Sequence, residues 1–330
     1  MTQRPFSKTR SFFEPRAVIS CARKGSSYRS FPHTRPTLEA TSERPLTMTD
    51  SPDATADDRP TLRANCADCF ALCCTAFGFQ RSADFPINKP AGTPCLNLAD
   101  DFSCSIHHSL RARGFRGCTV FDCFGAGQYV SQNLFGGTNW RERPDTSAEM
   151  FSTFAVVRQL HEMLWYLVEA AERATTTDLL RPVAQLQSEI QRALERDASE
   201  ILATDVERIR SEVRQTLIDV SEEARGGYAA LAEDNVSDDL HPSADLVGRD
   251  LRSTRLCGAD LRGAYLIAAD LRRGDLTGVD LLGADLRGAR LEGANLSNAL
   301  FLTQLQVDAA QGDGATVLPD ALSRPRHWLA

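Results

Sequence analysis

Leucine recurs every five residues along the C-terminal part of the chain, from Leu246 to Leu296, and Phe301 takes the next position of the series. A small residue, most often alanine, stands two positions before most of these leucines. Neither a helix, with a period of about 3.6, nor a strand, with a period of about 2, produces this spacing. A five-residue unit does fit one side of a square coil in which the large and the small residue both point inward. We therefore predict a solenoid over residues 244–301.

The unit has the form Ala-(Asp/Asn)-Leu-x-x, which is intact at residues 259–263 and 294–298. It resembles the pentapeptide-repeat family, and the resemblance implies a right-handed quadrilateral β-helix. Twelve repeats at four per coil would give three coils, a rod of about 14 Å at a strand spacing of about 4.8 Å. Arg249 occupies a small-residue position, and because burying arginine is costly we expect regular coiling to begin after residue 250. Residues 302–330 are expected to cap the last coil.

Between residues 146 and 227 the apolar positions follow the helical period. Thr146 and Glu149 have the spacing of a capping box, and Gly226-Gly227 is expected to end the segment. The apolar runs span residues 150–171, 179–194 and 202–220. Their narrow stripes predict a helical hairpin or short coiled coil. The segment carries fifteen Asp and Glu against nine Arg, which is typical of a solvated face or of a face that binds a partner.

Eight of the ten cysteines lie within residues 66–123. Thiolates bind zinc and iron well, and a Cys-x2-Cys turn lets two sulfurs approach one ion. Cys73 and Cys74 are adjacent, so their side chains diverge and would serve different ions or different corners of one cluster. A disulfide framework is the alternative, although it is typical of oxidising compartments. The candidate metal ligands are Cys66, Cys69, Cys73, Cys74, Cys95, Cys104, Cys118 and Cys123.

The same cysteines carry a second resemblance, which covers residues 62 to about 130. Their order is Cys-x2-Cys-x3-Cys-Cys, then Gly-x2-Cys, Cys-x-Ile-His and Cys-x2-Phe-x-Cys, and it is similar to that of a bacterial family of zinc- or iron-chelating cysteine clusters. The resemblance implies metal binding and no particular reaction. Zinc is favoured over an iron–sulfur cluster, because eight thiolates complete two tetrahedral zinc sites. His107 is a spare donor that we expect beside the ligands and not among them.

Composition divides the chain further. Residues 1–47 carry nine basic and three acidic residues, which leaves a net charge of −13 on the remainder. We expect an unstructured extension there, in preference to a transit peptide or a nucleic-acid-binding arm. The expected fold class is multidomain α+β. Its expected domains are a disordered extension (1–61), a cysteine-rich metal-binding domain (62–145), a helical connector (146–227), an acidic linker (228–243), the β-helix (244–301) and a C-terminal cap (302–330).

Two further observations concern location and base composition. No run of 18 or more apolar residues is present, so no membrane span is expected and the protein is expected to be cytoplasmic. The basic residues are 34 arginines and only three lysines, Lys8, Lys24 and Lys89. We attribute this bias to genomic base composition.

The sequence favours a binding protein over an enzyme. No phosphate loop, nucleophile elbow or catalytic carboxylate pair stands out. His161, Glu162 and Glu169 lie on the helices but lack the second Glu-x2-His of a di-iron site. The favoured function is a non-enzymatic metal-binding module that senses, or that binds a protein partner or a second copy of the chain. No small-molecule substrate, nucleic acid or membrane is indicated as a partner.

Two alternative functions stay open: an iron–sulfur metalloenzyme, and a DNA mimic that modulates a topoisomerase. DNA mimicry requires an extended surface of one sign. Residues 244–301 contain seven Asp and one Glu against eight Arg, so acids and arginines are expected to pair on the solenoid surface. This charge balance argues against the DNA mimic.

Overall fold

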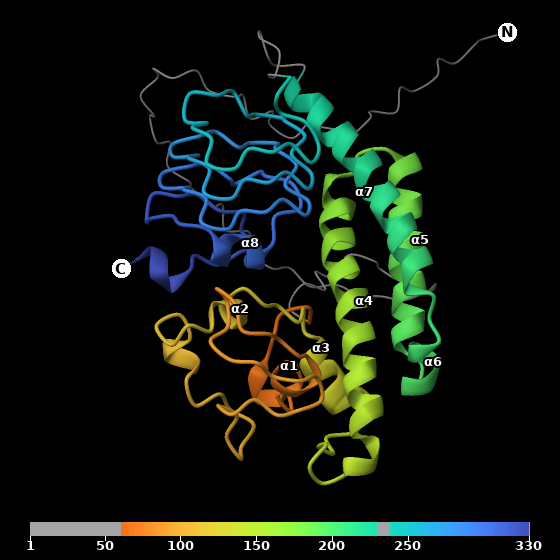
Figure 1. The fold of residues 1–330 in the computed structure, drawn as a ribbon. Coiled ribbons are helices and arrows are strands. Elements are labelled where there is room, and N and C mark those ends of the chain that lie inside the picture. The colour runs from red at the N-terminus through yellow and green to blue at the C-terminus, as the bar shows by residue number, and fades with distance from the viewer. Residues whose placement is uncertain (1–60, 230–237, 330) are drawn as a thin grey trace, which may run out of the picture.

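The computed structural model describes residues 61–229 and 238–329 of the chain. Most of the expected N-terminal extension and residues 230–237 of the acidic linker lie outside these ranges. The cysteine-rich segment and the C-terminal coil lie one below the other along the long helix α4 (Ser147–Arg173), as Figure 1 shows. None of the described helices combines the length and the apolar character that crossing a bilayer demands.

A bundle of helices follows the cysteine-rich segment. Its members are α4, α5 (Thr177–Leu194), α6 (Ala198–Leu202) and α7 (Val206–Ala229). The three apolar runs lie on α4, α5 and α7, except that Leu202 at the start of the third run ends α6. The expected hairpin is wrong, because α4 packs against all three of the other helices. Asp197 caps α6 by accepting a hydrogen bond from the Glu200 amide, and Ile201 buries its side chain in the shared core.

The ends of two helices differ from expectation. The Thr146 hydroxyl donates to the Arg143 carbonyl at 2.9 Å and makes no capping bond to α4. Helix α7 continues through Gly226 and Gly227 to Ala229. Two helical glycines cost about 1 kcal/mol each. The extra turn brings Tyr228 against the coil, and this contact explains why the helix does not stop earlier.

Short elements build the cysteine-rich segment. They comprise α1 (Leu72–Ala76), α2 (Arg116–Thr119), α3 (Ala126–Gln128), the 3-10 turns Cys66–Asp68, His107–Ser109 and Pro144–Thr146, and a π-helical turn at Tyr129–Leu134. Two isolated antiparallel bridges join its loops, Phe79 to Lys89 and Leu98 to Cys104. A segment with so little regular structure depends on tertiary contacts to hold its shape.

The repeats form a coil with a period of twenty residues. Parallel bridges connect Asp245 to Tyr265 and Tyr265 to Asp285, so four five-residue units make one turn of the coil. The expected β-helix, and the α+β class with it, is nevertheless wrong: across residues 61–229 and 238–329 there are helices and isolated bridges but no β-strand and no sheet. The physical reason is that a turn interrupts each side of the coil, so every bridge is one residue wide and no ladder develops.

The interior of the coil is filled as the pattern predicts. Leu261, Leu271 and Ala264 are each 0 % exposed. The predicted starting point is wrong, since the Leu246 amide already donates to the Tyr265 carbonyl at 3.0 Å. Arg249 lies on this first turn with an exposed side chain, so its burial cost does not arise.

The C-terminal tail lies against the last turn of the coil. Gln311 continues the coil by bridging to Arg290. Helix α8 (Gln304–Ala309) begins with a complete capping box formed by Thr303 and Gln306. The Gln306 side-chain amide also donates to two coil carbonyls at 2.7 and 2.9 Å. Backbone acceptors at the end of the coil thereby gain partners.

Two helices hold the coil. On α4, Glu169 accepts a hydrogen bond from the Phe301 amide at 3.0 Å, and the buried Phe301 ring packs edge-on against Tyr166. On α7, Ser221 donates to Asp280 and Arg225 pairs with Asp260 at 3.1 Å. The coil is therefore fixed by polar contacts at its side and by an aromatic contact at its end.

The contact between Tyr228 and the coil can be tested with a matched pair of glycine variants. Gly278 and Gly283 have φ angles of +67° and +66°, so alanine at either position costs about 1–2 kcal/mol of backbone strain. A Cβ at Gly278 would lie 2.3 Å from the Tyr228 ring, whereas at Gly283 it meets nothing within 4 Å. Gly278→Ala should therefore lower the melting temperature more than Gly283→Ala, and adding Tyr228→Ala should remove the difference. Equal losses in the two variants would contradict the contact.

Asp280 is a buried carboxyl at the junction of coil and bundle, with 0 % exposure. Burial raises its pKa to about 6, with repulsion from Asp260 adding to the rise, against the hydrogen bond from Ser221 and the charge of Arg262. Asp260 is neutralised by Arg262 and Arg225, whose nitrogens lie 2.5 and 3.1 Å from its Oδ2. Asp280 therefore keeps its proton in the folded state over a range where the unfolded chain loses it.

This shift gives a stability difference of defined sign. Asp280 ionises with an ordinary pKa near 3.8 when unfolded and near 6 when folded, so its contribution to stability is full below about pH 4 and is lost as the pH rises to about 6. Asp280→Asn cannot titrate. We expect the unfolding free energy of wild type, measured relative to this variant in urea, to fall between pH 4 and pH 6. A difference that stays constant across this range would contradict the assignment.

Candidate functional site

The eight clustered cysteines come from the short helices and loops of residues 61–146, and all are free thiols. Cys73 and Cys74 lie on α1, Cys118 lies on α2, and the other five lie in 3-10 turns or loops. Backbone contacts draw the loops toward α1: the Cys95 amide donates to the Cys74 carbonyl at 3.0 Å. Free thiols do not support the disulfide framework within this cluster.

Cys74 acts on thiols throughout the cluster, namely Cys66, Cys73, Cys104 and Cys118, and for description we divide the eight thiols into two groups. The first thiol group comprises Cys66, Cys69, Cys73 and Cys123, and the second thiol group comprises Cys74, Cys95, Cys104 and Cys118. In the first group, two sulfurs lie over α3, since a Cβ on Gly127 would be 2.6 Å from Cys69 Sγ and 3.8 Å from Cys123 Sγ. The two groups adjoin at Cys74, which also acts on Cys66.

Burial and negative neighbours raise the pKa values of the first thiol group. Burial raises the pKa of Cys69 to about 11, and Cys123 and Cys66 contribute to the rise. Burial likewise raises the pKa of Cys123, with a contribution from the Asp122 carboxyl beside it. The first thiol group therefore faces an additional acidic side chain.

The second thiol group has a similar internal repulsion but a different neighbour. Burial raises the pKa of Cys118 to about 12. Cys74, Cys95 and Cys104 contribute to the same rise, because a negatively charged sulfur disfavours ionisation of a neighbouring thiol. The Lys89 ammonium acts in the opposite direction. A cation thus accompanies this group where a carboxyl accompanies the other.

Cys73 and Cys74 belong to different groups although they are adjacent. Their Sγ atoms lie 3.9 Å apart. The hydrogen bond to Cys74 raises the pKa of Cys73 well above its ordinary value. The same hydrogen bond, together with Lys89, lowers the pKa of Cys74 to about 7, although burial opposes the shift. Of the two thiols, Cys74 therefore ionises first.

Lys89 is the residue of this site that the sequence analysis missed. It is only 5 % exposed, and its Nζ donates to the carbonyls of Thr75, Pro90 and Thr93 at 3.2, 3.2 and 2.7 Å. The sequence held an indication of its role: a lysine among 34 arginines, placed between Cys74 and Cys95, departs from the base-composition bias. A compact ammonium fits a pocket of carbonyls and sulfurs better than a planar guanidinium.

The side chains as they stand do not form a coordination sphere. Within the described part of the chain, no three His, Cys, Asp or Glu side chains are grouped so that they could hold a metal ion. His107 and His108 are both exposed. Coordination of a metal would require the thiols to move toward a common point.

His161 on α4 connects the cysteine-rich segment to the bundle. It is 4 % exposed, its Nδ1 lies 2.7 Å from the Phe124 carbonyl, and its ring packs edge-on against Tyr129. Burial lowers its pKa to about 4, so the ring is neutral at pH 7 and Nδ1 donates to the carbonyl. His161 therefore fixes the residue that follows Cys123, and the di-iron interpretation of this helix gains no support.

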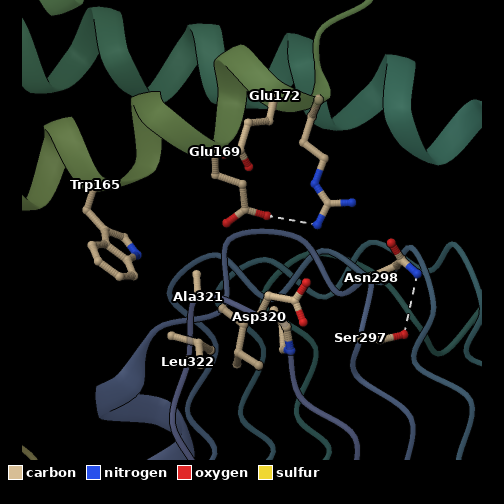
Figure 2. Close-up of a pocket in the computed structure, with 11 residues that line it drawn as sticks. Trp165, Glu169, Glu172, Ser297, Asn298, Asp320, Ala321 and Leu322 are labelled. Carbon is tan, nitrogen blue, oxygen red and sulfur yellow. Dashed lines mark hydrogen bonds and ion pairs between the residues drawn. The ribbon is translucent and has the colours of Figure 1, made fainter. Parts of the chain in front are cut away.

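A cavity of about 490 Å³ lies between α4 and the end of the coil (Figure 2). It is lined by Trp165, Glu169, Glu172, Arg173, Ser297, Asn298, Leu302 and residues 319–322. Arg173 pairs with Glu169 at 3.3 Å, and Glu169 also accepts from the backbone of Phe301. Because these polar groups hold the coil against the helix, we assign the cavity a structural role.

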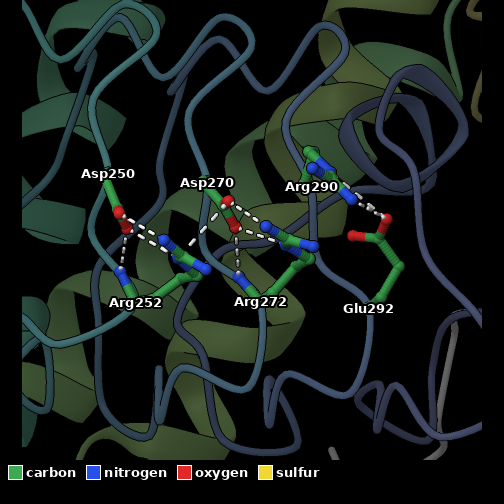
Figure 3. Close-up of polar contacts among 6 residues, drawn as sticks. All are labelled: Asp250, Arg252, Asp270, Arg272, Arg290 and Glu292. Atoms are coloured by element: carbon green, nitrogen blue, oxygen red, sulfur yellow. Dashed lines mark hydrogen bonds and ion pairs between the residues drawn. The ribbon is translucent and has the colours of Figure 1, made fainter.

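The charged side chains on one face of the coil pair with one another (Figure 3). Asp250 pairs with Arg252 and Asp270 with Arg272, each at 2.6 Å. Arg252 also reaches Asp270 on the next turn at 3.5 Å. The predicted neutralisation of acids by arginines is confirmed for these pairs, and it leaves no surface of a single sign here.

Comparison with known protein families identifies the family of the coil. Residues 244–281 and 264–301 match the pentapeptide repeats, in eight copies. The C-terminal coil is therefore a pentapeptide-repeat array.

Similarity extends well beyond the array. Across 271 residues the chain is 48% identical to the uncharacterized protein YybG of Bacillus subtilis (strain 168), which covers 81% of this chain and 95% of YybG. The chain belongs to the same family as YybG. No solved structure matches it.

The thiol pKa values predict an order of reactivity. In reduced, metal-stripped protein, the hydrogen bond with Cys73 lowers the pKa of Cys74 to about 7, whereas burial raises the pKa values of Cys69 and Cys118 to about 11 and 12. Brief treatment with iodoacetamide should therefore label Cys74 before either of these, as tandem mass spectrometry of the peptides would reveal. Earlier labelling of Cys69 or Cys118 would contradict the charge distribution.

Proposed function

We propose that residues 61–146 bind two metal ions, each through four cysteines, and that the protein is a non-enzymatic module that interacts with a protein partner. The carrying observation is the clustering of eight free thiols on α1 and on the loops that pack around it. Four thiolates complete a tetrahedral zinc site, so each group supplies one full set of ligands. The resemblance to zinc- or iron-chelating cysteine clusters supports the same proposal.

The donor set fits zinc chemically. Bound zinc would cross-link loops that have little regular structure, and its charge would deprotonate the thiols whose pKa values burial raises. Cys66, Cys69, Cys73 and Cys123 would hold one ion; Cys74, Cys95, Cys104 and Cys118 would hold the other.

The proposed role in partner binding depends on α4. His161 of this helix contacts the backbone beside Cys123, and Glu169 of the same helix contacts the end of the coil. A change at the first thiol group could therefore reach the coil along one helix. We further propose a cytoplasmic location, where reducing conditions keep eight thiols available for metal.

Metal stoichiometry of the purified protein tests the proposal. Anaerobically purified wild type should carry two zinc ions by native mass spectrometry and elemental analysis. Cys73→Ser and Cys74→Ser should each lose one ion, and the double variant should lose both. Cys73 and Cys74 are neighbours on α1, so a substitution that disturbs the whole helix would lower the metal content of either single variant, whichever ion the residue binds.

Variants outside α1 identify which ion each single substitution removes. Cys69→Ser should remove the same ion as Cys73→Ser, and Cys95→Ser should remove the same ion as Cys74→Ser. Combining Cys69→Ser with Cys73→Ser should therefore remove no further ion, whereas combining Cys69→Ser with Cys74→Ser should remove the second ion. A metal-free wild type, or the loss of both ions in every single variant, would overturn the proposal. Visible absorption with iron in the elemental analysis would replace zinc with an iron–sulfur centre.

A further inference from the structure

The cavity between α4 and the end of the coil has an excess of negative charge. Three carboxylates line it, those of Glu169, Glu172 and Asp320, against one guanidinium, that of Arg173. Arg173 pairs with Glu169 and donates to the Ala299 carbonyl, each at 3.3 Å, so it already belongs to the wall. The volume of about 490 Å³ lies within the range of ligand pockets. The lining therefore favours a cationic occupant.

The buried part of this cavity is aromatic. Trp165 lines it from α4, one helical turn before Glu169, and is only 6 % exposed. The Trp165 ring packs at 6.0 Å from the Phe124 ring. Glu172 and Asp320 are exposed, so they lie at the mouth, with Asp320 facing α4 from the C-terminal tail (Figure 2). A guanidinium stacks on an indole and forms forked bonds to carboxylates, so this combination fits an arginine side chain.

The described part of the chain begins beside the same cavity. The Arg63 guanidinium donates to the Ala321 carbonyl at 2.9 Å, and Ala321 belongs to the lining. Leu62 is 4 % exposed in the core that runs along α4, and the Gln128 side-chain amide donates to the Arg63 carbonyl at 2.8 Å. Residues 1–60 therefore continue from an anchored point next to the cavity wall.

Arg59 is the cation of that segment nearest to the anchored point. It is the only basic residue between positions 45 and 60. Two residues span at most about 7 Å, so the Arg59 backbone stays close to Thr61. Asp57 and Asp58 come directly before Arg59, and the carboxylates of the cavity repel them. We therefore expect the arginine side chain, and not the preceding backbone, to enter the cavity.

We propose that this cavity is a guanidinium site and that Arg59 of the same chain occupies it. The guanidinium lies against the Trp165 indole and pairs with the carboxylates of Glu172 and Asp320 at the mouth. The contact fastens the N-terminal extension to the junction between the bundle and the coil. It involves neither a thiol nor a metal, so it is independent of the proposed function.

Thermal stability of the full-length protein tests whether the site is occupied. Arg59→Met keeps the length of the side chain and removes its charge, and it should lower the melting temperature by about 2–4 °C. In a background of Glu172→Gln with Asp320→Asn, the same substitution should have little effect, because the partners of the guanidinium are already lost. Arg44→Met, elsewhere in the extension, is the matched control and should leave the melting temperature unchanged.

Zero-length cross-linking tests where the side chain lies. In Arg59→Lys, a carbodiimide should join residue 59 to Glu172 or Asp320 within one copy of the chain, as tandem mass spectrometry of the peptides would show. Arg44→Lys should give no such product. Failure of residue 59 to cross-link to either carboxylate would overturn the proposal.

The remaining outcomes distinguish other occupants of the cavity. A loss of stability in Arg59→Met that persists in the Glu172→Gln, Asp320→Asn background would place Arg59 elsewhere and overturn the proposal. A cross-link between two copies would make a second molecule the occupant, and stabilisation of the wild type by spermidine with no effect of Arg59→Met would make it a free cation. Both results would also overturn the proposal, and neither would affect the metal content expected of the thiols.

Discussion

The apolar surface of helix α4 is the constraint on which the other parts of the molecule depend. One continuous core runs along it, and that core includes Phe124 from the cysteine-rich segment and Phe301 from the end of the repeats. Neither of these parts has much regular structure of its own. Burying a phenylalanine from each against the same helix gives both a fixed position, and a few directed polar contacts, from His161 and Glu169, then set their orientation.

The backbone amides and carbonyls of the repeat array find hydrogen-bond partners although the array contains no strands. Backbone groups of each turn hydrogen-bond to the next turn through single-residue bridges about twenty residues apart. The Gln306 side chain of the tail donates to a carbonyl of the last turn. Paired acids and arginines then cover the outside, so the array presents a mixed, neutralised surface. Recognition by such a surface would depend on shape more than on long-range attraction.

Patterns of local origin were predictable, and contacts between distant segments were not. The leucine series and the helical runs follow from periodicity, and the corresponding positions are buried. The packing of α4 on three helices depends on the direction of each connection, which no period encodes. The Arg249 side chain is exposed because it lies on the first turn of the coil, which has no further turn beyond it. The eight cysteines were found by composition, but their division into groups required the fold. Lys89 was overlooked because its meaning depends on what surrounds it.

The twenty-residue register places a limit on how this family can change in length. The face that meets α7 includes residues 260, 278 and 280, and the end that meets α4 includes residues 299 and 301. Adding one five-residue unit between them would turn the earlier part of the coil by a quarter turn relative to its end, and Asp260 and Asp280 would face away from α7. A whole circuit of four units would restore the rotation, but it would move Asp260 and Asp280 about 4.8 Å along the coil axis, away from Ser221 and Arg225. The helical bundle therefore fixes the length of the array between its two contacts.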